Sequence, residues 1–186
     1  MQDLTQIKAE ARKAAFQRRK AAHDMNKPGT AGHLSEVLAG YRGVPLAGYM
    51  PIRTEIDPLP AMAEAAAHGP VGVPVIQAAE TPLKFSRWTP EGALRDGPFG
   101  AKVPEIDDYF EPEILIVPLV GFDARGGRLG YGGGFYDRTL ELLRGKRPTL
   151  AIGFAYEAQR ADALPLEPTD QPLDIIVTEN GIYDIR

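Results

Sequence analysis

Residues 114–144 read ILIVPLVGFDARGGRLGYGGGFYDRTLELLR and place seven glycines between an apolar run and a run with leucines at helical spacing. The first run, 114–120, is short and rich in β-branched residues, which predicts a buried strand, and the last run, 136–144, predicts a helix. The glycines therefore lie at a predicted strand-to-helix turn. Glycine tolerates positive φ and lets backbone N–H groups approach an anion, which the positive end of a helix dipole also attracts. The stretch predicts a phosphate-binding loop.

Charged side chains in this stretch fit the same interpretation. Arg125 and Arg128 add positive charge, and Asp137 places a carboxylate at the predicted helix start, where a metal ion on phosphates needs one. A glycine-rich surface loop without a ligand is the alternative, but such a loop does not need Arg, Tyr, Phe and Asp interleaved at each step. The common nucleotide motifs are missing from the sequence: there is no G-x-x-x-x-G-K-[ST], and a G-x-G-x-x-G frame begun at Gly130 meets Phe135 at its last glycine.

The remaining segments predict further helices and strands in alternation. Residues 4–25 lack Pro and Gly and predict a long helix, which Lys27-Pro28-Gly29 ends. Residues 89–109 read as a Pro/Gly-rich connection, and Pro74 is expected to place its strand at an edge or to distort it. A second helix is expected at 61–68, and strands at 46–50, 71–78, 83–88, 149–154 and 175–177.

Interleaved helices and strands predict an α/β fold: a single three-layer domain with a mostly parallel sheet flanked by helices. Ligands of such sheets bind beyond the carboxyl ends of the strands, which is where the glycine stretch follows 114–120. Asp170 and Asp174 precede the expected strand at 175–177. A carboxylate there could face Asp137 across the site, or both could be turn residues.

Composition limits the class of protein. A chain of 186 residues fits one domain, and the lack of cysteine excludes disulfides, thiolate nucleophiles and Cys-ligated zinc. His23, His33 and His68 have no metal-ligand spacing. The longest apolar runs are too short for a membrane-spanning helix and the N-terminus lacks an apolar signal core, so we expect a soluble, cytoplasmic protein.

The charge is unevenly distributed. Residues 1–27 carry seven Lys and Arg against three Asp and Glu, whereas the net charge of the whole chain is −4. This pattern indicates a local anion site more than a nucleic-acid surface, which is usually basic over a whole face. Lys8, Arg12 and Arg19 share one stripe of the first helix, for which a solvated cationic face is the alternative.

At this point the chain resembles the 5-formyltetrahydrofolate cyclo-ligase family, also called 5,10-methenyltetrahydrofolate synthetases. The resemblance spans nearly the whole chain and implies one domain over residues 1–186 with a NagB/RpiA/CoA-transferase-like architecture. It rests on Lys8 with Arg12, YMPIRTEID at 49–57, LKFSRW at 83–88, GPFG at 97–100, VPLVGFD through GRLGYGGGFYDR at 117–138, Gln159, and Asp170 with DIIVTE at 174–179.

The resemblance implies a reaction in which ATP and 5-formyltetrahydrofolate give 5,10-methenyltetrahydrofolate, ADP and phosphate, with Mg²⁺ required. The formyl oxygen attacks the γ-phosphorus, N10 adds to the activated carbon, and phosphate leaves. Phosphoryl transfer of this kind depends on N–H donors, a cation and fixed metal ligands more than on a nucleophile from the protein.

The resemblance also implies roles for individual residues. Arg128, Tyr136 and Asp137 are the expected catalytic residues, and Asp137 and Asp170 the expected magnesium ligands, since that ion prefers carboxylate oxygens. The expected ATP contacts are Lys8, Arg12, Arg128, Leu129, Gly130, Tyr131, Gly132, Gly133, Gly134, Phe135 and Tyr136. The expected substrate contacts are Met50, Glu55, Trp88, Tyr131, Gly132, Gly133, Gly134 and Phe135.

Two of these substrate contacts have a stated chemistry. Glu55 can accept paired hydrogen bonds from the amino-pyrimidinone edge of a pterin. Trp88 and Phe85 are candidate stacking walls, with a place in the core as the alternative for Phe85.

One departure from the family keeps alternatives open. Many relatives carry Glu before the proline where this chain has Val103-Pro104, and Glu105 follows two positions on. A paralogue that binds folate or nucleotide without efficient turnover is one alternative. A phosphosugar isomerase-like enzyme, which needs an acid/base group but no ATP, is another. We expect a monomer whose partners are small molecules, without nucleic acid or membrane.

Overall fold

The computed structural model describes residues 3–186, so residues 1 and 2 of the expected domain lie outside it. Its helices are α1 (Leu4–Asp24), α2 (Gly32–Ala39), α3 (Leu59–Ala66) and α4 (Phe135–Lys146), with short 3-10 turns η1 (Pro98–Gly100) and η2 (Glu157–Gln159). The strands of the main sheet are β1 (Leu46–Ala47), β2 (Val71–Val75), β3 (Lys84–Arg87), β6 (Tyr109–Phe110), β7 (Ile114–Pro118), β10 (Leu150–Phe154), β11 (Ile175–Val177) and β12 (Ile182–Asp184).

The main sheet is mostly parallel, as the sequence predicts. Its order is β12-β11-β10-β7-β1-β2-β3-β6. The five strands from β11 to β2 run parallel, and antiparallel pairs form only towards the two edges, between β11 and β12 and between β2, β3 and β6. Two hairpins stand apart from it: β4 (Leu94–Asp96) with β5 (Lys102–Pro104), and β8 (Gly121–Phe122) with β9 (Arg128–Leu129).

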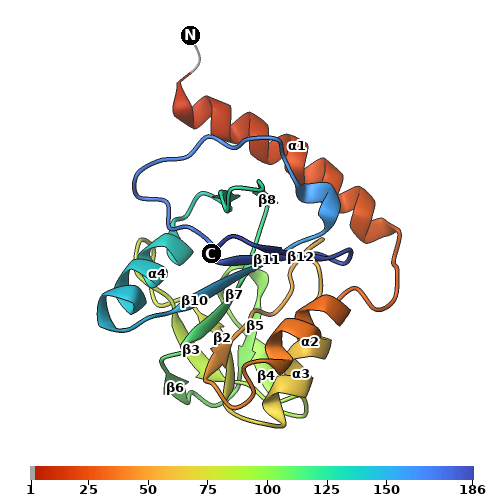
Figure 1. Cartoon of the computed structure of the whole chain (residues 1–186). Helices are drawn as coiled ribbons and strands as arrows, with labels where there is room; N and C mark the ends of the chain where they lie inside the picture. Colours follow the sequence, from red (N-terminus) through yellow and green to blue (C-terminus); the bar gives the residue numbers. More distant parts are fainter. Residues whose placement is uncertain (1–2) are drawn as a thin grey trace.

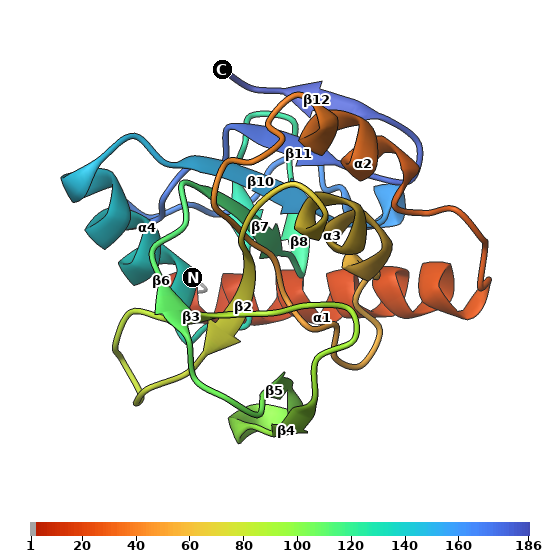
Figure 2. The same ribbon diagram turned by 90° about the horizontal axis from the view of Figure 1, so that it is seen from below.

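Alternate residues of the buried strands form two hydrophobic cores, one on each face of the sheet. Ile114 and Ile116 of β7 pack into the cluster under α2 and α3, and Leu115 and Val117 pack into the cluster under α4. Figures 1 and 2 show α2 and α3 together on one side of the sheet and α4 on the other. Side chains of a strand point to alternate faces, so a strand buried on both faces is apolar throughout. The result is the expected three-layer arrangement.

Helix α1 belongs to neither covering layer. It crosses one end of the sheet, where it packs against β8 and η2 (Figure 1). Its 21 residues are mostly polar, and only Ala15 and Arg19 are buried. No helix within residues 3–186 is both long and apolar enough to cross a bilayer.

Pro74 was expected to place its strand at an edge or to distort it, and the first of these alternatives is wrong. Strand β2 lies inside the sheet, between β1 and β3. The Gly48 N–H donates to the Gly72 carbonyl, so the next backbone groups on this side of β2 belong to Pro74, beyond the end of β1 at Ala47. The missing N–H of proline therefore faces a position where no neighbouring strand needs it.

Residues 89–109 do not form an irregular connection, because the hairpin of β4 and β5 lies within them. The three residues of β4 are all exposed, so no alternation of buried apolar side chains marks the strand in the sequence. Helix α2 and strand β12 were not expected either. Each is short, with eight and three residues, and short elements leave little periodicity to read.

The hairpin of β8 and β9 separates β7 from the glycine loop. Its turn is organised by Asp123, which is fully buried and accepts hydrogen bonds from the N–H groups of Arg125 (2.9 Å), Gly127 (3.0 Å) and Leu164 (3.0 Å). The Arg125 guanidinium also pairs with Asp123, at 2.9 Å. The expectation that Arg125 adds charge to an anion site is therefore wrong: it braces this turn.

Asp123→Ala should lower the free energy of unfolding by about 2–3 kcal/mol, because buried N–H groups lose their acceptor. Burial opposes the charged form, but hydrogen bonds from Arg125, Leu164 and Gly127 outweigh it and lower the pKa of Asp123. The stabilisation is therefore present above about pH 4 and is lost as pH falls through the lowered folded-state pKa. Urea unfolding near neutral and near pH 3 measures both effects. Asp162→Ala, at an exposed position, is the control, and an equal loss in both variants at neutral pH would contradict the prediction.

Candidate functional site

A cavity of about 760 Å³ lies beyond the carboxyl ends of the parallel strands. Pro118 ends β7 at its floor, and the loops that follow β1 and β2 contribute Tyr49 and Ile76. The other walls come from α1, the β4–β5 hairpin, the glycine loop, the start of α4 and residues 167–170. This is the position in which open parallel sheets bind their ligands.

The glycine loop, residues 130–134, joins β9 to α4 along one wall. Gly132 and Gly134 have φ of 98° and 71°, the left-handed region that favours glycine. Gly134 is also the N-cap of α4, and no side chain caps the helix there. The N-terminus of α4 and its dipole therefore point at the cavity without a protein carboxylate or hydroxyl in the capping position, as in anion-binding helix termini.

The cationic stripe of α1 faces the protein, so a solvated face is excluded for its three members. Lys8 Nζ lies 3.4 Å from both Asp170 Oδ2 and Glu167 Oε1. Arg12 Nε donates to the Gly130 carbonyl at 2.8 Å, which ties α1 to the glycine loop. Arg19 is buried beneath the cavity wall, and Lys8 and Arg12 line the cavity itself.

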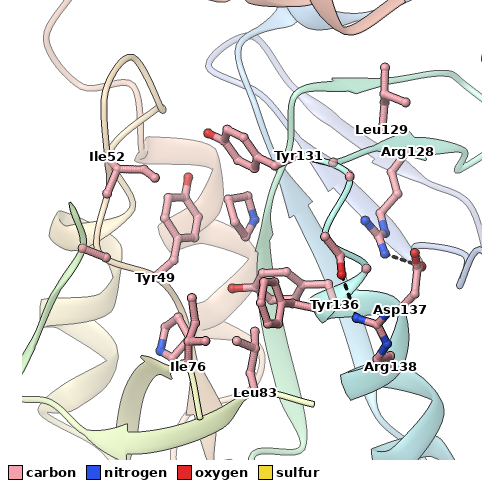
Figure 3. A pocket seen from close by; sticks show the side chains of 18 of the residues that line it. Tyr49, Ile52, Ile76, Leu83, Arg128, Leu129, Tyr131, Tyr136, Asp137 and Arg138 are labelled. Atoms are coloured by element: carbon pink, nitrogen blue, oxygen red, sulfur yellow. Dashed lines mark hydrogen bonds and ion pairs between the residues drawn. The ribbon is translucent and has the colours of Figure 1, made fainter. Parts of the chain in front are cut away.

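The two expected metal ligands both line the cavity, each beside a cation. Asp137 pairs with the Arg128 guanidinium, which Figure 3 shows facing it, and also accepts from the Gln171 N–H at 2.8 Å. Asp170 accepts from the Glu167 N–H at 2.8 Å and lies beside Lys8.

Asp174 is not part of this site. It accepts hydrogen bonds from Arg144 at 3.1 Å and from the Ala151 N–H at 2.8 Å, so its role is structural.

Asp137 and Asp170 fit a magnesium ion bound together with phosphates. Mg²⁺ prefers oxygen ligands and is usually held by one or two carboxylates, water and substrate phosphates. Among residues 3–186, no group of three or more His, Cys, Asp or Glu side chains could hold a metal ion. An ion at this site would therefore take ligands from a bound phosphate chain as well as from the protein.

The opposite side of the cavity is aromatic and apolar. Tyr136 points from α4 towards the side formed by Tyr49, Ile52 and Ile76 (Figure 3). Its hydroxyl is buried and has no hydrogen-bond partner among the described residues. Burial raises the pKa of Tyr136, so the phenol stays protonated and can donate to a ligand. A buried donor without an acceptor is costly, which favours a ligand acceptor at this point.

Glu55 is a buried carboxylate on this apolar side. Its Oε1 accepts from the Ile52 N–H at 2.8 Å and its Oε2 from the Tyr131 hydroxyl at 2.9 Å. Burial raises the pKa of Glu55, while these hydrogen bonds and the positive charge of Arg19 act in the opposite direction. Each carboxylate oxygen can accept a second hydrogen bond, so Glu55 can still bind a ligand donor.

The structure brings most of the expected site residues to this cavity. The expected residues that line it are Lys8, Arg12, Met50, Glu55, Arg128, Leu129, Gly130, Tyr131, Gly132, Gly133, Gly134, Phe135, Tyr136, Asp137 and Asp170. Trp88 was expected to contact the substrate but does not line this cavity. It is 6% exposed, packs in the core and lines a separate cavity of about 260 Å³. Phe85 is also in the core, the alternative considered for it.

The position that departs from the family pattern lies at the main cavity. Val103 on β5 is 2% exposed and lines it, whereas Glu105 lines the smaller cavity beside Trp88. Glu105 therefore does not replace the carboxylate that is expected before the proline in many relatives.

Several cavity residues were not predicted from the sequence to contact a ligand. Arg138 donates to the Gly133 carbonyl at 2.7 Å and braces the loop, while Glu167 and Leu83 reach the cavity from distant segments. The stripe of α1 did single out Arg19, but only the structure places it against Tyr131.

Gly134→Ala should weaken anion binding, because a Cβ at φ 71° strains the turn by about 1–2 kcal/mol and displaces the N-terminus of α4. Inorganic tripolyphosphate should raise the melting temperature of the wild type more than that of the variant. Gly145→Ala is the matched control on α4, since a Cβ there meets no atom and alanine favours a helix. Equal tripolyphosphate stabilisation of all three proteins would contradict a phosphate-binding role for this turn.

The model of the 5-formyltetrahydrofolate cyclo-ligase family matches residues 5–179. A 5-formyltetrahydrofolate cyclo-ligase of Haemophilus influenzae is 42% identical over 101 residues, which are 51% of this chain and 54% of that protein. One from Mycolicibacterium smegmatis is 29% identical over 198 residues, covering 96% of this chain and 97% of its own.

Solved structures agree with this match. The structure of Aquifex aeolicus 5,10-methenyltetrahydrofolate synthetase superposes with a TM-score of 0.80 at 27% identity, over 97% of this chain and 93% of the other. The mixed α/β fold with a mostly parallel sheet is therefore shared with a synthetase structure. The expected likeness to the NagB/RpiA/CoA-transferase group is not tested by this neighbour and stays a prediction.

Proposed function

Because this chain belongs to the 5-formyltetrahydrofolate cyclo-ligase family, we propose that it converts 5-formyltetrahydrofolate to 5,10-methenyltetrahydrofolate at the expense of ATP, which becomes ADP and phosphate. The match covers only about half of the length of the Haemophilus relative, so the activity of that protein is proposed, and not concluded, for this chain. The roles of individual residues are part of the same proposal.

One observation carries the proposal: the same cavity joins a half that suits phosphate to a half that suits a pterin. The open N-terminus of α4, the glycine loop and the cations Lys8, Arg12 and Arg128 lie on one side. The buried carboxylate of Glu55 and the apolar wall lie on the other. A reaction that moves a phosphoryl group from a nucleotide to a folate needs these two halves to meet.

In the phosphate half, the protein supplies charge neutralisation. N–H groups of the glycine loop and the guanidinium of Arg128 would contact phosphate oxygens as charge builds on the transferring group. Asp137 and Asp170 would hold Mg²⁺, which supplies Lewis-acid stabilisation of that charge when bound. Lys8 and Arg128 already lie against these carboxylates, so nucleotide binding would exchange ion pairs within the protein for pairs with phosphate.

In the folate half, the protein supplies orientation. Glu55 would accept two N–H groups from the amino-pyrimidinone edge, a planar pair that matches a carboxylate. Met50 and the side chains from Tyr131 to Phe135 would pack against the ring. The unpaired hydroxyl of Tyr136 would donate to the formyl or a phosphate oxygen, holding the two reacting groups together.

Val103 supports a second candidate, a paralogue that binds folate or nucleotide without efficient turnover. It gives the main cavity an apolar wall where many relatives are expected to have Glu. A phosphosugar isomerase-like activity stays the third alternative, and its lack of ATP dependence separates it from the other two. A cytoplasmic location, a monomeric state and the lack of nucleic-acid or membrane partners also stay predictions.

The test of the main proposal is an assay with purified protein, Mg²⁺-ATP and 5-formyltetrahydrofolate. The absorbance of the methenyl product should develop in step with ADP release and should require both ATP and the metal. Asp137→Asn should lower kcat about a hundredfold or more, because a carboxylate for the metal is lost. This loss would also show that the activity comes from this chain and not from a contaminant. Binding of folate or nucleotide without product would support the paralogue, and turnover of a sugar phosphate without ATP would support the isomerase.

Lys8→Ala should raise KM for ATP severalfold and leave KM for 5-formyltetrahydrofolate nearly unchanged, since Lys8 lies in the phosphate half. Lys13→Ala is the matched control, because Lys13 is exposed on the same helix. Initial rates over both substrates measure the two constants. A larger change in KM for 5-formyltetrahydrofolate than in KM for ATP would contradict the placing of α1 beside the nucleotide.

A further inference from the structure

Arg19 is a buried cation that lines neither the phosphate half nor the folate half of the cavity. It is 1% exposed on the inward side of α1, and within the described part of the chain it forms no direct ion pair with a carboxylate. Its guanidinium donates instead to Thr54 Oγ1 at 2.9 Å and to the Tyr131 hydroxyl at 2.7 Å. A buried charge is costly unless its environment compensates it, so Arg19 requires a partner further along this chain of hydrogen bonds.

Tyr131 connects Arg19 to Glu55. Arginine only donates, so the hydroxyl accepts from Arg19 and donates its own hydrogen bond to Glu55 Oε2, 2.9 Å away. Burial raises the pKa of Tyr131 to about 12, so the phenol keeps this proton near neutral pH. The guanidinium carbon also lies 5.0 Å from the Phe16 ring centre and 5.6 Å from that of Tyr131, which keeps both partners in place.

We infer that Arg19 and Tyr131 are positioning residues that keep Glu55 ionised and aimed at the cavity, so that it selects a ligand edge with two adjacent N–H donors. The inference rests on the proposed function, in which that edge belongs to the pterin of the folate substrate. An ionised carboxylate accepts at both oxygens, whereas a protonated one turns an O–H donor towards a ligand that also donates. The ionisation state of Glu55 therefore decides whether the pterin edge binds.

Burial is the largest influence on Glu55 and raises its pKa. The Ile52 N–H and the Tyr131 hydroxyl oppose this rise, as do the positive charges of Arg19 on α1 and Arg53 on the same loop. Without Arg19, Tyr131 loses the donor that polarises it and a positive charge is removed from the interior. The pKa of Glu55 then rises further, and the ionised form is lost at a higher pH as the solution is acidified.

The other titratable groups that face Glu55 do not replace Arg19. Tyr49, which follows β1, and Tyr136 on α4 are phenols whose pKa values burial raises, so both are neutral near pH 7. Arg53 is exposed, and solvent weakens its effect on a buried carboxylate. Arg19 is thus the one buried cation among the groups described around Glu55.

The first experiment titrates Glu55 by NMR in protein labelled with ¹³C-glutamate, with Glu55→Gln to identify its signal. Arg19→Gln should raise the pKa of Glu55 by about one unit, and Arg19→Lys, which keeps the charge, by less. Arg18→Gln is the matched control: it removes the same charge from the neighbouring position of α1, where the side chain donates to the Ala158 carbonyl near the surface. It should leave the Glu55 titration unchanged.

The second experiment measures kcat/KM for 5-formyltetrahydrofolate against pH. In Arg19→Gln and in Tyr131→Phe the acid limb should move to higher pH. In the double variant Arg19→Gln/Tyr131→Phe the limb should move by less than the sum of the two single shifts, because the hydroxyl transmits part of the effect of Arg19 and the rest is a direct effect of its charge. A purely structural role for Arg19 would lower kcat or stability without moving the limb.

An unchanged Glu55 pKa in folded Arg19→Gln would overturn the inference, as would additive shifts in the double variant. If Arg19→Gln does not fold, Tyr131→Phe keeps the ring and decides the matter: an acid limb that stays in place overturns the inference. A wild type that neither binds nor turns over the folate refutes the proposed function instead, and the NMR titration still tests the coupling between Arg19 and Glu55.

Discussion

Two hydrogen bonds from α1 hold the glycine loop in place, and the cavity depends on them. Arg12 binds the Gly130 carbonyl and Arg19 binds the Tyr131 hydroxyl, across more than a hundred residues of chain. A loop with Gly132 and Gly134 at positive φ has little conformational preference of its own. Its shape is therefore decided by the side chains that bracket it, from α1 on one side and from Arg138 on the other.

Charge in the cavity is balanced before any ligand binds. Arg128 pairs with Asp137 and Lys8 with Asp170, so four charged groups can be half-buried without the full cost of isolated ions. The same groups suit a phosphate chain with its metal ion, since each cation and each carboxylate then has an alternative partner of opposite sign. On the other side, the chain from Arg19 through Tyr131 provides a similar balance for the buried Glu55.

The walls of the cavity differ in how firmly they are held. The sheet and α4 contribute side chains anchored in the two cores, such as Leu83 beside Thr139, whose hydroxyl accepts from the Leu83 N–H at 2.9 Å. The β4–β5 hairpin contributes Val103 from outside the main sheet, with β4 fully exposed. Val103 is buried but belongs to neither of the two core clusters, so a substitution there acts first on the wall of the cavity.

The sequence by itself determined the long first helix, the strand at 114–120, the α/β class and the glycine loop, because each depends on local spacing of apolar residues or glycines. All the residues expected at the site except Trp88 line the cavity, but others that line it, such as Arg138 and Glu167, were not predicted. Only the tertiary structure decided that Arg125 braces a turn, that Asp174 anchors a strand and that Arg19 reaches Glu55 through Tyr131. These outcomes depend on contacts between segments far apart in the chain, and neither residue type nor spacing encodes which distant partner a charged side chain will meet.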